Sequence, residues 1–529
     1  MNLLRAVTTV SGMTLLSRIT GLARESLKAM AFGAGTEMDA FEAAFRLPNI
    51  LRRMFAEGAF AQAFVPIFAE YRRQRGEAET HDLVSRVGTL LAVVLLVVTA
   101  VGVLAAPWLV YALASGFAKT PGKVALTTEL IRIVFPYIFF VSLVSLAGGV
   151  LNVYRRFAIP AVTPVLLNIA IIGAALFLSP YVNPPVTALA WGVLIGGVAQ
   201  LAVQVRPLLA LHMLPLPRFD WHHPGVRRVL LAMAPAVVGV SAGQITVLIN
   251  TQLAAALGDG RISWITYADR LMEFPGALLG VALGTVLLPS LSRHHADADP
   301  AQYSALLDWG VRLAFLLAMP AAIALWILAV PIITTLYQYG RFSINDVMQT
   351  RSALLGYTVG LLGLILVKIL APGFYARQNM KTPVQIAFVT VFVGLAAGLV
   401  LMVPLGHAGL TLATSIGACL NASLLFWFLR RSGIYRPQPG WLSFSARLMV
   451  ALGVLEAVLL WVSGPAAFWL HASLSAKGAR LAGVCVMAGI VYFGALWLLG
   501  FRLGDFDRRD PDSVTANEPV LPVAPPDAG

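Results

Sequence analysis

Basic and acidic side chains gather inside apolar stretches of this chain, where a charge is expensive to bury. The basic members are Arg18, Arg24, Lys28, Arg46, Arg52, Arg53 and Arg270, and the acidic members are Glu25, Asp39, Glu42, Glu57, Asp269 and Glu273. A charged side chain at the centre of a bilayer costs about 2.5–3.5 kcal/mol, so these groups must face a water-filled cavity or one another. The planar guanidinium fork suits bidentate binding of phosphate. The cluster therefore predicts a site for a phosphate-bearing anion.

Most of these charges share a face if their segments are helical. At about 100° per residue, the polar side chains of residues 38–69 fall within an arc of roughly 120°; they are Asp39, Glu42, Arg46, Asn49, Arg53 and Glu57, with Arg52 at one edge. A second polar stripe combines Ser263, Tyr267, Arg270 and Glu273. Arg18 lies about 120° from Arg24 on an ideal helix. Both can line one space only if that space is wide or the helix bends near Gly21.

The same charges could instead satisfy one another without a ligand. Arg24 could pair with Asp39, and Arg270 with Glu273, as internal salt bridges. Arg312, four residues from Asp308, fits that description well. For the clustered arginines we favour the anion site, because arginine predominates among the basic residues.

Composition places these charges in a membrane protein. The chain has 529 residues, of which 58% are hydrophobic and 12% charged, and its mean hydropathy is +0.80. A soluble domain is about 45–50% apolar and about 25% charged, so a soluble enzyme, a secreted domain and a disordered scaffold are excluded. Long apolar runs, separated by proline, glycine and charged residues, predict about fourteen spanning helices. They cover residues 8–32, 38–69, 84–113, 127–153, 158–179, 186–207, 225–257, 262–291, 305–329, 346–376, 382–403, 407–430, 440–463 and 480–501.

The basic residues between spans predict the orientation, because cytoplasmic loops are enriched in lysine and arginine. Most of them fall on the side of the N-terminus, which predicts that both termini are cytoplasmic. The opposite side has only Lys119, Lys123, Arg261, Arg341, Lys477 and Arg480. The net charge of +13 is thus an orientation signal, and we expect no nucleic-acid partner.

A weak internal repeat predicts two lobes. Tyr154-x-Arg156 matches Tyr375-x-Arg377, although chance similarity among apolar helices is the alternative. A repeat of six spanning helices ends on the side of the membrane where it began, so the second repeat starts from the same side as the first. The lobes would therefore be parallel and related by a pseudo-two-fold axis along the membrane normal. The predicted organisation is a first lobe over residues 1–215, a second over 216–436, two further helices over 437–504, and a disordered cytoplasmic tail over 505–529.

Catalytic and metal-binding patterns are weak. There is no P-loop and no G-x-S-x-G motif, and Cys419 and Cys485 match no metal spacing. The pair His294-His295 falls in a polar segment typical of a solvated loop. We therefore expect a carrier that is not an enzyme and has neither a cofactor nor a bound metal.

Long motifs in the chain resemble those of the lipid II flippase family, MurJ (also called MviN), in the multidrug/oligosaccharidyl-lipid/polysaccharide exporter superfamily. The matching segments are GAGTEMDAFEAAFRLPNILRRMFAEGAFAQAFVPIFAEYRRQ, NPPVTALAW, SWITYADRLMEFPGALLGVALGTVLLPSLS and VKILAPGFYARQNMKTPV. The resemblance runs from Met1 to about residue 502. Two positions depart from the family pattern, Glu25 in place of aspartate and Arg46 in place of lysine, and both keep the sign of the charge.

The resemblance implies a function and a set of site residues. The function is movement of undecaprenyl-pyrophosphate-MurNAc-pentapeptide-GlcNAc from the cytoplasmic to the periplasmic leaflet of the bacterial inner membrane, for peptidoglycan synthesis. The substrate-binding residues would be Arg18, Arg24, Asn49, Arg52, Arg53 and Arg270, and the gating or orienting residues Asp39, Ser263 and Glu273. The implied partners are lipid II, membrane lipids and cell-wall synthesis proteins, and residues 437–504 would hold the lipid tail. Sodium coupling stays open, with Gln244 and Asn250 as the polar candidates in the seventh span.

We expect alternating access between two lobes, driven by membrane potential. Two negative charges moving outward gain at most about 4.6 kcal/mol per 100 mV. The alternatives are an exporter of another polyprenyl-linked oligosaccharide or of a drug, a scaffold that recruits cell-wall enzymes without transport, and a membrane glycosyltransferase. An arginine-rich cavity disfavours a cationic drug, and no acidic catalytic loop outside the membrane supports the glycosyltransferase.

Overall fold

The structure, a computed structural model, describes residues 3–54 and 60–502, and within these residues all regular secondary structure is helical. Glu57 and the predicted tail 505–529 lie outside the described residues. The first half of the chain forms α1 (Leu3–Phe32), α2 (Thr36–Leu51), α3 (Ala61–Gln74), α4 (Gly76–Leu104), α5 (Ala106–Ala114), α6 (Lys123–Val134), α7 (Tyr137–Val153), α8 (Ala158–Gly173), α9 (Thr187–Ala210) and α10 (Pro224–Ala256). The second half forms α11 (Arg261–Ala296), α12 (Pro300–Ile327), α13 (Ala329–Leu336), α14 (Ile344–Thr358), α15 (Leu361–Leu370), α16 (Pro372–Tyr375), α17 (Lys381–Leu405), α18 (His407–Arg431), α19 (Trp441–Ser463), α20 (Ala466–His471) and α21 (Leu474–Leu498).

Several predicted spans are interrupted rather than continuous. The segment predicted as one helix over residues 38–69 contains α2, π-helical residues at 52–54 and, beyond residues 55–59, α3. Pro48 lies inside α2 just before that turn, and proline removes a backbone donor and crowds the preceding turn. Pro136 likewise separates α6 from α7. Pro48 and Pro136 thus lie near points where regular α-helical geometry is interrupted.

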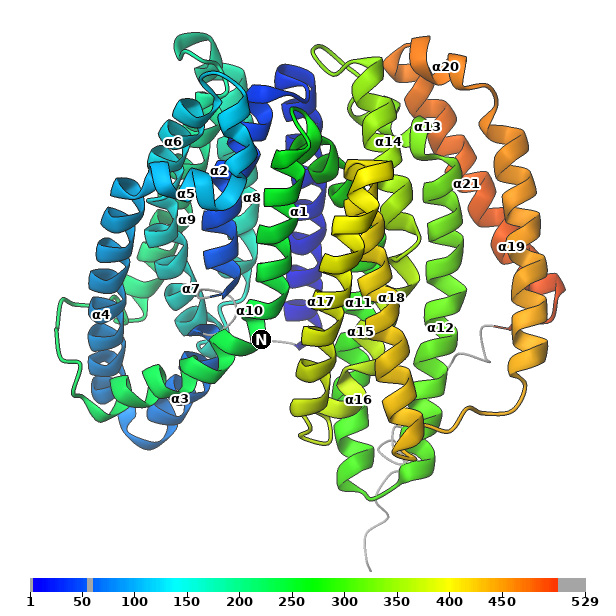
Figure 1. The fold of residues 1–529 in the computed structure, drawn as a ribbon. Helices are drawn as coiled ribbons and strands as arrows, with labels where there is room; N and C mark the ends of the chain where they lie inside the picture. The colour runs from blue at the N-terminus through cyan, green and yellow to red at the C-terminus, as the bar shows by residue number, and fades with distance from the viewer. Residues whose placement is uncertain (1–2, 55–59, 503–529) are drawn as a thin grey trace, which may run out of the picture.

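The helices form two bundles that face each other across the middle of the molecule (Figure 1). The first bundle contains α2–α9 and the second contains α11–α18, with α19 and α21 on the outer side of the second. Helix α1 packs against α8 of the first bundle. We call the end with loops 33–35, 257–260 and 337–343 the upper end, and the other the lower end.

Helix α10 connects the two bundles. Its lower part lies along α3, where Arg228 forms an ion pair with Glu70 at 2.7 Å, and its upper part contacts α5 and α17. Val226 and Val229 belong to an apolar cluster with Phe64 and Phe68 of α3. The start of the predicted second lobe is therefore packed on the first bundle.

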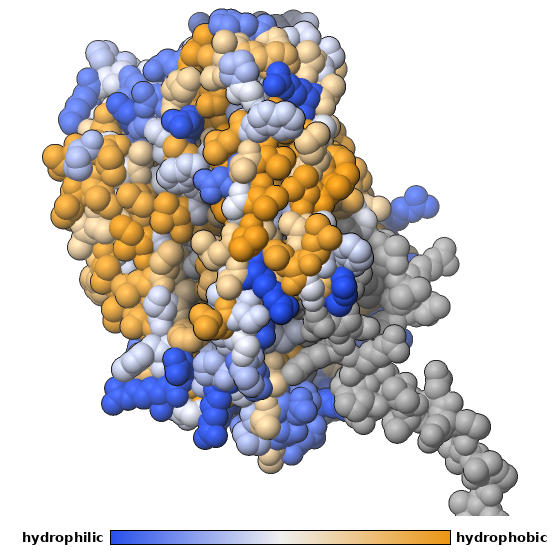
Figure 2. Space-filling view, turned by 90° about the vertical axis from the view of Figure 1, so that its right-hand side faces the viewer, coloured by the Kyte–Doolittle hydropathy of each residue, from blue (hydrophilic) through white to orange (hydrophobic). Residues whose placement is uncertain are grey.

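The outer surface is that of a membrane protein. Among the described residues, ten helices or helix runs are long and apolar enough to cross a membrane. Figure 2 shows apolar side chains gathered in a belt over the face of α19 and α21, with polar side chains above and below it. Trp461 and Leu498 are among the exposed apolar residues. The count of fourteen spans and the symmetry of the lobes stay predictions.

Candidate functional site

A cavity of about 990 Å³ lies between the two bundles. Most of its lining comes from α1, α2, α7, α8, α9 and α11, with further residues from α3, α12, α13 and α21, and it extends to Asn152 and Pro160 near the lower end. All six residues predicted to bind substrate line it, together with Glu273: Arg18, Arg24, Asn49, Arg52, Arg53, Arg270 and Glu273. Arg18 and Arg24 share this one space because the space is wide, and α1 is a single helix through Gly21.

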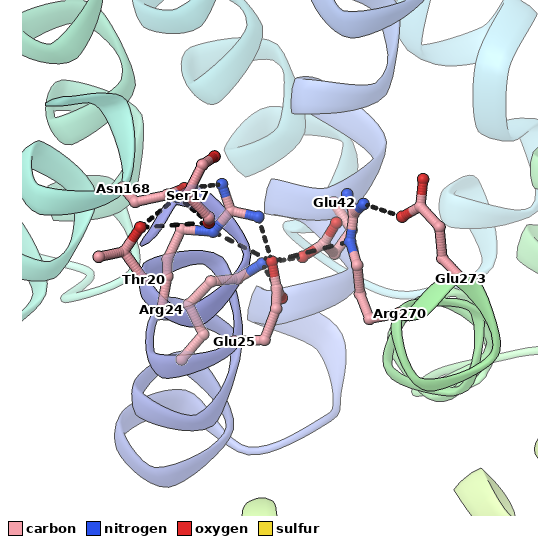
Figure 3. Close-up of polar contacts among 9 residues, drawn as sticks. Ser17, Thr20, Arg24, Glu25, Glu42, Asn168, Arg270 and Glu273 are labelled. Carbon is pink, nitrogen blue, oxygen red and sulfur yellow. Dashed lines mark hydrogen bonds and ion pairs between the residues drawn. The ribbon is translucent and has the colours of Figure 1, made fainter. Parts of the chain in front are cut away.

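Arg24 is held in place by residues of two helices (Figure 3). Its Nη1 donates to Oδ1 of Asn168 in α8 at 2.9 Å, and its Nε donates to Oε1 of Glu25 at 3.1 Å. Asn168 in turn donates to the hydroxyl of Thr20 at 3.0 Å and to the carbonyl of Ser17 at 3.2 Å. The guanidinium is therefore fixed on one wall of the cavity, with its side chain 12% exposed.

Glu25 is the shared counter-ion of the site. It accepts from Lys28 Nζ at 2.8 Å, and its Oε1 lies 3.9 Å from Nε of Arg270 in the second bundle. Lys28 also contacts Glu42 at 2.5 Å, and Arg270 donates to Glu273 at 2.9 Å. Charges of alternating sign thus run from α1 to α11 across the gap between the bundles.

The charge lining the cavity remains basic after these pairings. Five arginines and two carboxylates are the charged side chains among the described lining residues. Arg18 and Arg53 make no hydrogen bond or ion pair with the other described residues, and both are exposed. Arg46, which lines a smaller neighbouring cavity of about 80 Å³, donates to Thr266 at 3.0 Å. The described lining of the main cavity therefore carries an excess of positive charge, which favours an anion.

The other two predicted site residues, Asp39 and Ser263, lie above this cavity and contact each other. Asp39 of α2 is completely buried and accepts from the backbone N and the hydroxyl of Ser263 at 2.9 and 2.7 Å, and from the backbone N of Gly260 at 2.6 Å. These donors sit at the N-terminus of α11, where a carboxylate is favoured. Asp39 therefore connects α2 to the N-terminus of α11 in the second bundle.

Lys123 completes this upper contact. The sequence predicts Lys123 between two spans, whereas in the structure it begins α6, is 1% exposed and lies between Asp39, at 3.0 Å, and Asp259, at 2.6 Å. The internal pair considered for Arg24 and Asp39 is wrong, because Lys123 occupies that place. The pair of Arg270 with Glu273 is present.

Backbone atoms of the two bundles also meet at the upper end. The N–H of Arg341 donates to the carbonyl of Met30 at 2.9 Å. A Cβ at Gly33 would lie 2.7 Å from the Arg341 carbonyl oxygen, and one at Gly340 would lie 2.2 Å from the Met30 oxygen. Both glycines have a positive φ, 68° and 57°, which other residues rarely adopt. Only glycine permits this approach.

Sequence reasoning missed the residues that connect the site. Asn168, Lys123 and Asp259 hold the predicted residues in place, yet each lies in a segment that shows no charge pattern of its own. Lys123 follows a Thr-Pro-Gly turn, the only signal that a helix and its first side chains begin there. Long-range pairing of this kind is visible only once the bundles are placed.

The pair of helical bundles with a cavity between them has the fold of solved transporters of the multidrug/oligosaccharidyl-lipid/polysaccharide exporter superfamily. One solved structure of that superfamily, titled an inward-facing multidrug resistance MATE family transporter, matches with a TM-score of 0.68 at 14% identity, over 81% of this chain and 98% of the other. A structure titled lipid II flippase MurJ, inward closed conformation, matches with a TM-score of 0.75 at 22% identity, over 92% and 99%.

Sequence comparison gives the family. The family model described as lipid II flippase MurJ matches residues 28–477. The lipid II flippase MurJ of Burkholderia cenocepacia is 52% identical over 514 residues, which is 96% of this chain and 100% of that protein. The probable lipid II flippase MurJ of Vibrio cholerae is 40% identical over 95% of this chain and 97% of that protein. This chain belongs to the lipid II flippase MurJ family.

Proposed function

We propose that this protein moves lipid II, undecaprenyl-pyrophosphate-MurNAc-pentapeptide-GlcNAc, from the cytoplasmic to the periplasmic leaflet of a bacterial inner membrane. The observation that carries the proposal is the cavity with five arginines and two carboxylates among its described charged residues, in a member of the lipid II flippase family. Both termini would be cytoplasmic, which makes the lower end the cytoplasmic one.

The arginines supply the binding chemistry for pyrophosphate. Arg18 and Arg53 make no hydrogen bond or ion pair with the other described residues, and Arg24 of α1 and Arg270 of α11 both lie beside Glu25. A pyrophosphate between them accepts charge-assisted hydrogen bonds from several guanidinium groups, which are roughly twice as strong as neutral ones. Glu25 and Glu273 hold Arg24 and Arg270 while no anion is present. Asn49, whose Oδ1 accepts from Arg52 at 2.8 Å, orients that arginine.

The polyprenyl tail stays in the bilayer while the head group occupies the cavity. Apolar side chains of α12, α13 and α21 line one side of the cavity, namely Leu325, Ile332, Leu336 and Cys485. This wall reaches the outer helices α19 and α21, which carry many exposed apolar residues. It therefore supports a route for the tail at the C-terminal helices.

The upper contact acts as the periplasmic gate in this proposal. Asp39, Lys123 and Ser263 join the bundles above the cavity, so a head group entering from below meets a closed end. Alternating access then requires the upper hydrogen bonds to break while the lower ends come together. A membrane potential that is negative inside favours outward movement of the pyrophosphate.

A flipping assay with purified protein in liposomes and fluorescent lipid II tests the proposal. Arg24→Ala and Arg270→Ala should each lower the flipping rate by roughly 10- to 100-fold, because charged hydrogen bonds are worth about 1.5–3 kcal/mol. The matched control is Arg377→Ala, an exposed arginine outside the cavity, which should flip at the normal rate. Full activity of both cavity variants, or no flipping by the unmodified protein, would contradict the proposal.

The main rival, a drug exporter of the same superfamily, predicts a different ligand preference. A cationic drug would meet like charge at Arg18 and Arg53. Native mass spectrometry of the protein with lipid II and with a cationic dye separates the two: retention of the dye and not of lipid II would favour the exporter.

A further inference from the structure

In the lower part of the cavity, the wall formed by the first bundle contains a recess lined by polar but uncharged residues. Its lining combines side chains and small residues of α7, α8 and α9: Ser145, Gly148, Asn152, Thr163, Gln200 and Gln204. We call this set the amide recess. None of the six is ionisable, so the recess differs from the arginine-lined part of the same cavity.

Two of its amides are buried with unused hydrogen-bonding groups. Gln204 is 0% exposed, and neither its Nε2 nor its Oε1 has a partner among the described residues. Gln200 is 4% exposed; its Nε2 donates to the Thr163 carbonyl at 2.8 Å, but its Oε1 has no such partner. A buried polar group left unpaired costs about 1–3 kcal/mol, and most such groups in proteins are paired.

The two amides lie on one face of α9, opposite α7. Gln200 and Gln204 are four residues apart on α9 and so share a face. A Cβ at Gly148 of α7 would lie 3.6 Å from Pro160 and 3.9 Å from Oε1 of Gln204, so Gly148 lies beside that amide. Asn152, one turn below Gly148 on the same helix, is exposed in the cavity.

The recess also lies at a suitable distance from the arginines. Thr163 and Asn168 are five residues apart on α8, about 7.5 Å along the helix axis, and Asn168 holds Arg24. In a sugar diphosphate the first ring directly follows the phosphate. A ligand whose diphosphate contacts Arg24 would therefore place its next group toward the recess.

We infer that the amide recess is a binding subsite for the uncharged sugar of the substrate, in which the Gln200 and Gln204 amides exchange hydrogen bonds with hydroxyl and acetamido groups. An amide carries both donor and acceptor atoms, which matches the mixed donors and acceptors of a sugar. This inference rests on the proposed function, since it assumes that the diphosphate binds at the arginines.

Binding measurements with three lipids test the inference. The probes are undecaprenyl diphosphate, undecaprenyl diphosphate carrying one N-acetylglucosamine, and lipid II. Two variants are compared with the unmodified protein: the single variant Gln204→Met and the double variant Gln200→Met/Gln204→Met. In both variants the affinity for the two sugar-bearing lipids should fall about tenfold, while the affinity for undecaprenyl diphosphate stays unchanged. The control Gln302→Met, at an exposed position of α12, should bind all three as the unmodified protein does.

Three outcomes would overturn the inference. They are unchanged affinity for the sugar-bearing lipids, an equal loss for all three lipids, and a loss confined to lipid II, which would assign the recess to the peptide. Failure of the proposed function would give a different result. Binding of the three lipids to the protein would then not depend on Arg24.

Thermal unfolding without lipid adds a readout that separates binding from folding. Replacing an unpaired buried amide by an apolar side chain of similar shape is nearly neutral or stabilising. The melting temperature of Gln204→Met should therefore be unchanged or higher. A clear decrease would show that the amide is paired within the protein and would overturn the assignment to a ligand.

Discussion

The Asp39 carboxylate in α2 accepts two hydrogen bonds from Ser263 in α11, at 2.9 Å from its backbone N and 2.7 Å from its hydroxyl. Both residues are 0% exposed, and they belong to different bundles. One residue of the first bundle thus caps the helix that carries Arg270 in the second. This pair therefore links the upper end of the first bundle to the helix that carries Arg270.

Removing the charge of Asp39 should open the upper end. Asp39→Asn leaves Lys123 with Asp259 alone, and breaking a buried ion pair costs about 3–5 kcal/mol. Labelling of Ser145→Cys in the cavity by a membrane-impermeant maleimide added from the periplasmic side, with Cys419 and Cys485 replaced by serine, should rise. Thr36→Ala removes only an exposed hydrogen bond to Asp259 and serves as the control. Unchanged labelling in Asp39→Asn would rule out this gate.

Asn168 should matter to transport although it carries no charge. Asn168→Leu removes the acceptor for Arg24 and the donor to Thr20, so the guanidinium loses its orientation and flipping should fall about tenfold. Asn168→Asp keeps the acceptor oxygen and should retain more activity than the leucine variant. Equal loss in both variants would mean that the side chain acts through packing alone.

Two ion pairs of the same site should differ in their effect on stability. Glu25 is 2% exposed between Arg24 and Lys28, and Glu25→Gln should lower the free energy of unfolding by about 3–5 kcal/mol. Glu273 and Arg270 are 38% and 27% exposed, so Glu273→Gln should change it by about 0–1 kcal/mol. Denaturation of the two purified variants in detergent compares them directly. A loss in Glu273→Gln as large as in Glu25→Gln would contradict the burial argument.

Asp308 should control how firmly the outer helices are attached. Its Oδ1 accepts from Tyr435, from the backbone N of Gln438 and from Trp441, and its Oδ2 accepts from Arg312 at 2.8 Å. These contacts anchor the connection that leads into α19. In Asp308→Asn, hydrogen exchange in residues 432–445 should become faster while exchange in α2 and α11 is unaffected. Unaltered exchange at the connection would show that packing of Trp441 is sufficient.

The helices were largely predictable, because the length of an apolar run and the position of a proline are local properties of the sequence. The predicted span 186–207 corresponds to α9 and 407–430 to α18. The π-helical geometry at residues 52–54 was missed, because the polar stripe from Asp39 to Arg53 keeps its helical period into these residues.

The lining of the cavity was predictable to a similar extent, for a different reason. Charges such as Arg53 and Arg270 are too costly to face lipid, so burial cost alone assigns them to an interior space. The identity of each partner was not predictable, because Asp39 meets Lys123 of α6 in its own bundle and Gly260 of the other bundle, and packing sets both placements. Where two arrangements satisfy the same charges, only the fold decides between them.

The glycine contacts at the upper end have a consequence for ion leakage. At Gly33 and Gly340 the two bundles meet through backbone atoms, and a peptide group has no rotamer that could swing aside. Rotation of a single side chain could open a narrow channel between two helices. At this point no side chain separates the bundles, so small thermal fluctuations do not open a channel in that way. We expect the resting protein to behave as an electrical insulator, so that protons and sodium ions are kept back and only the concerted parting of the bundles exposes the cavity to the far side.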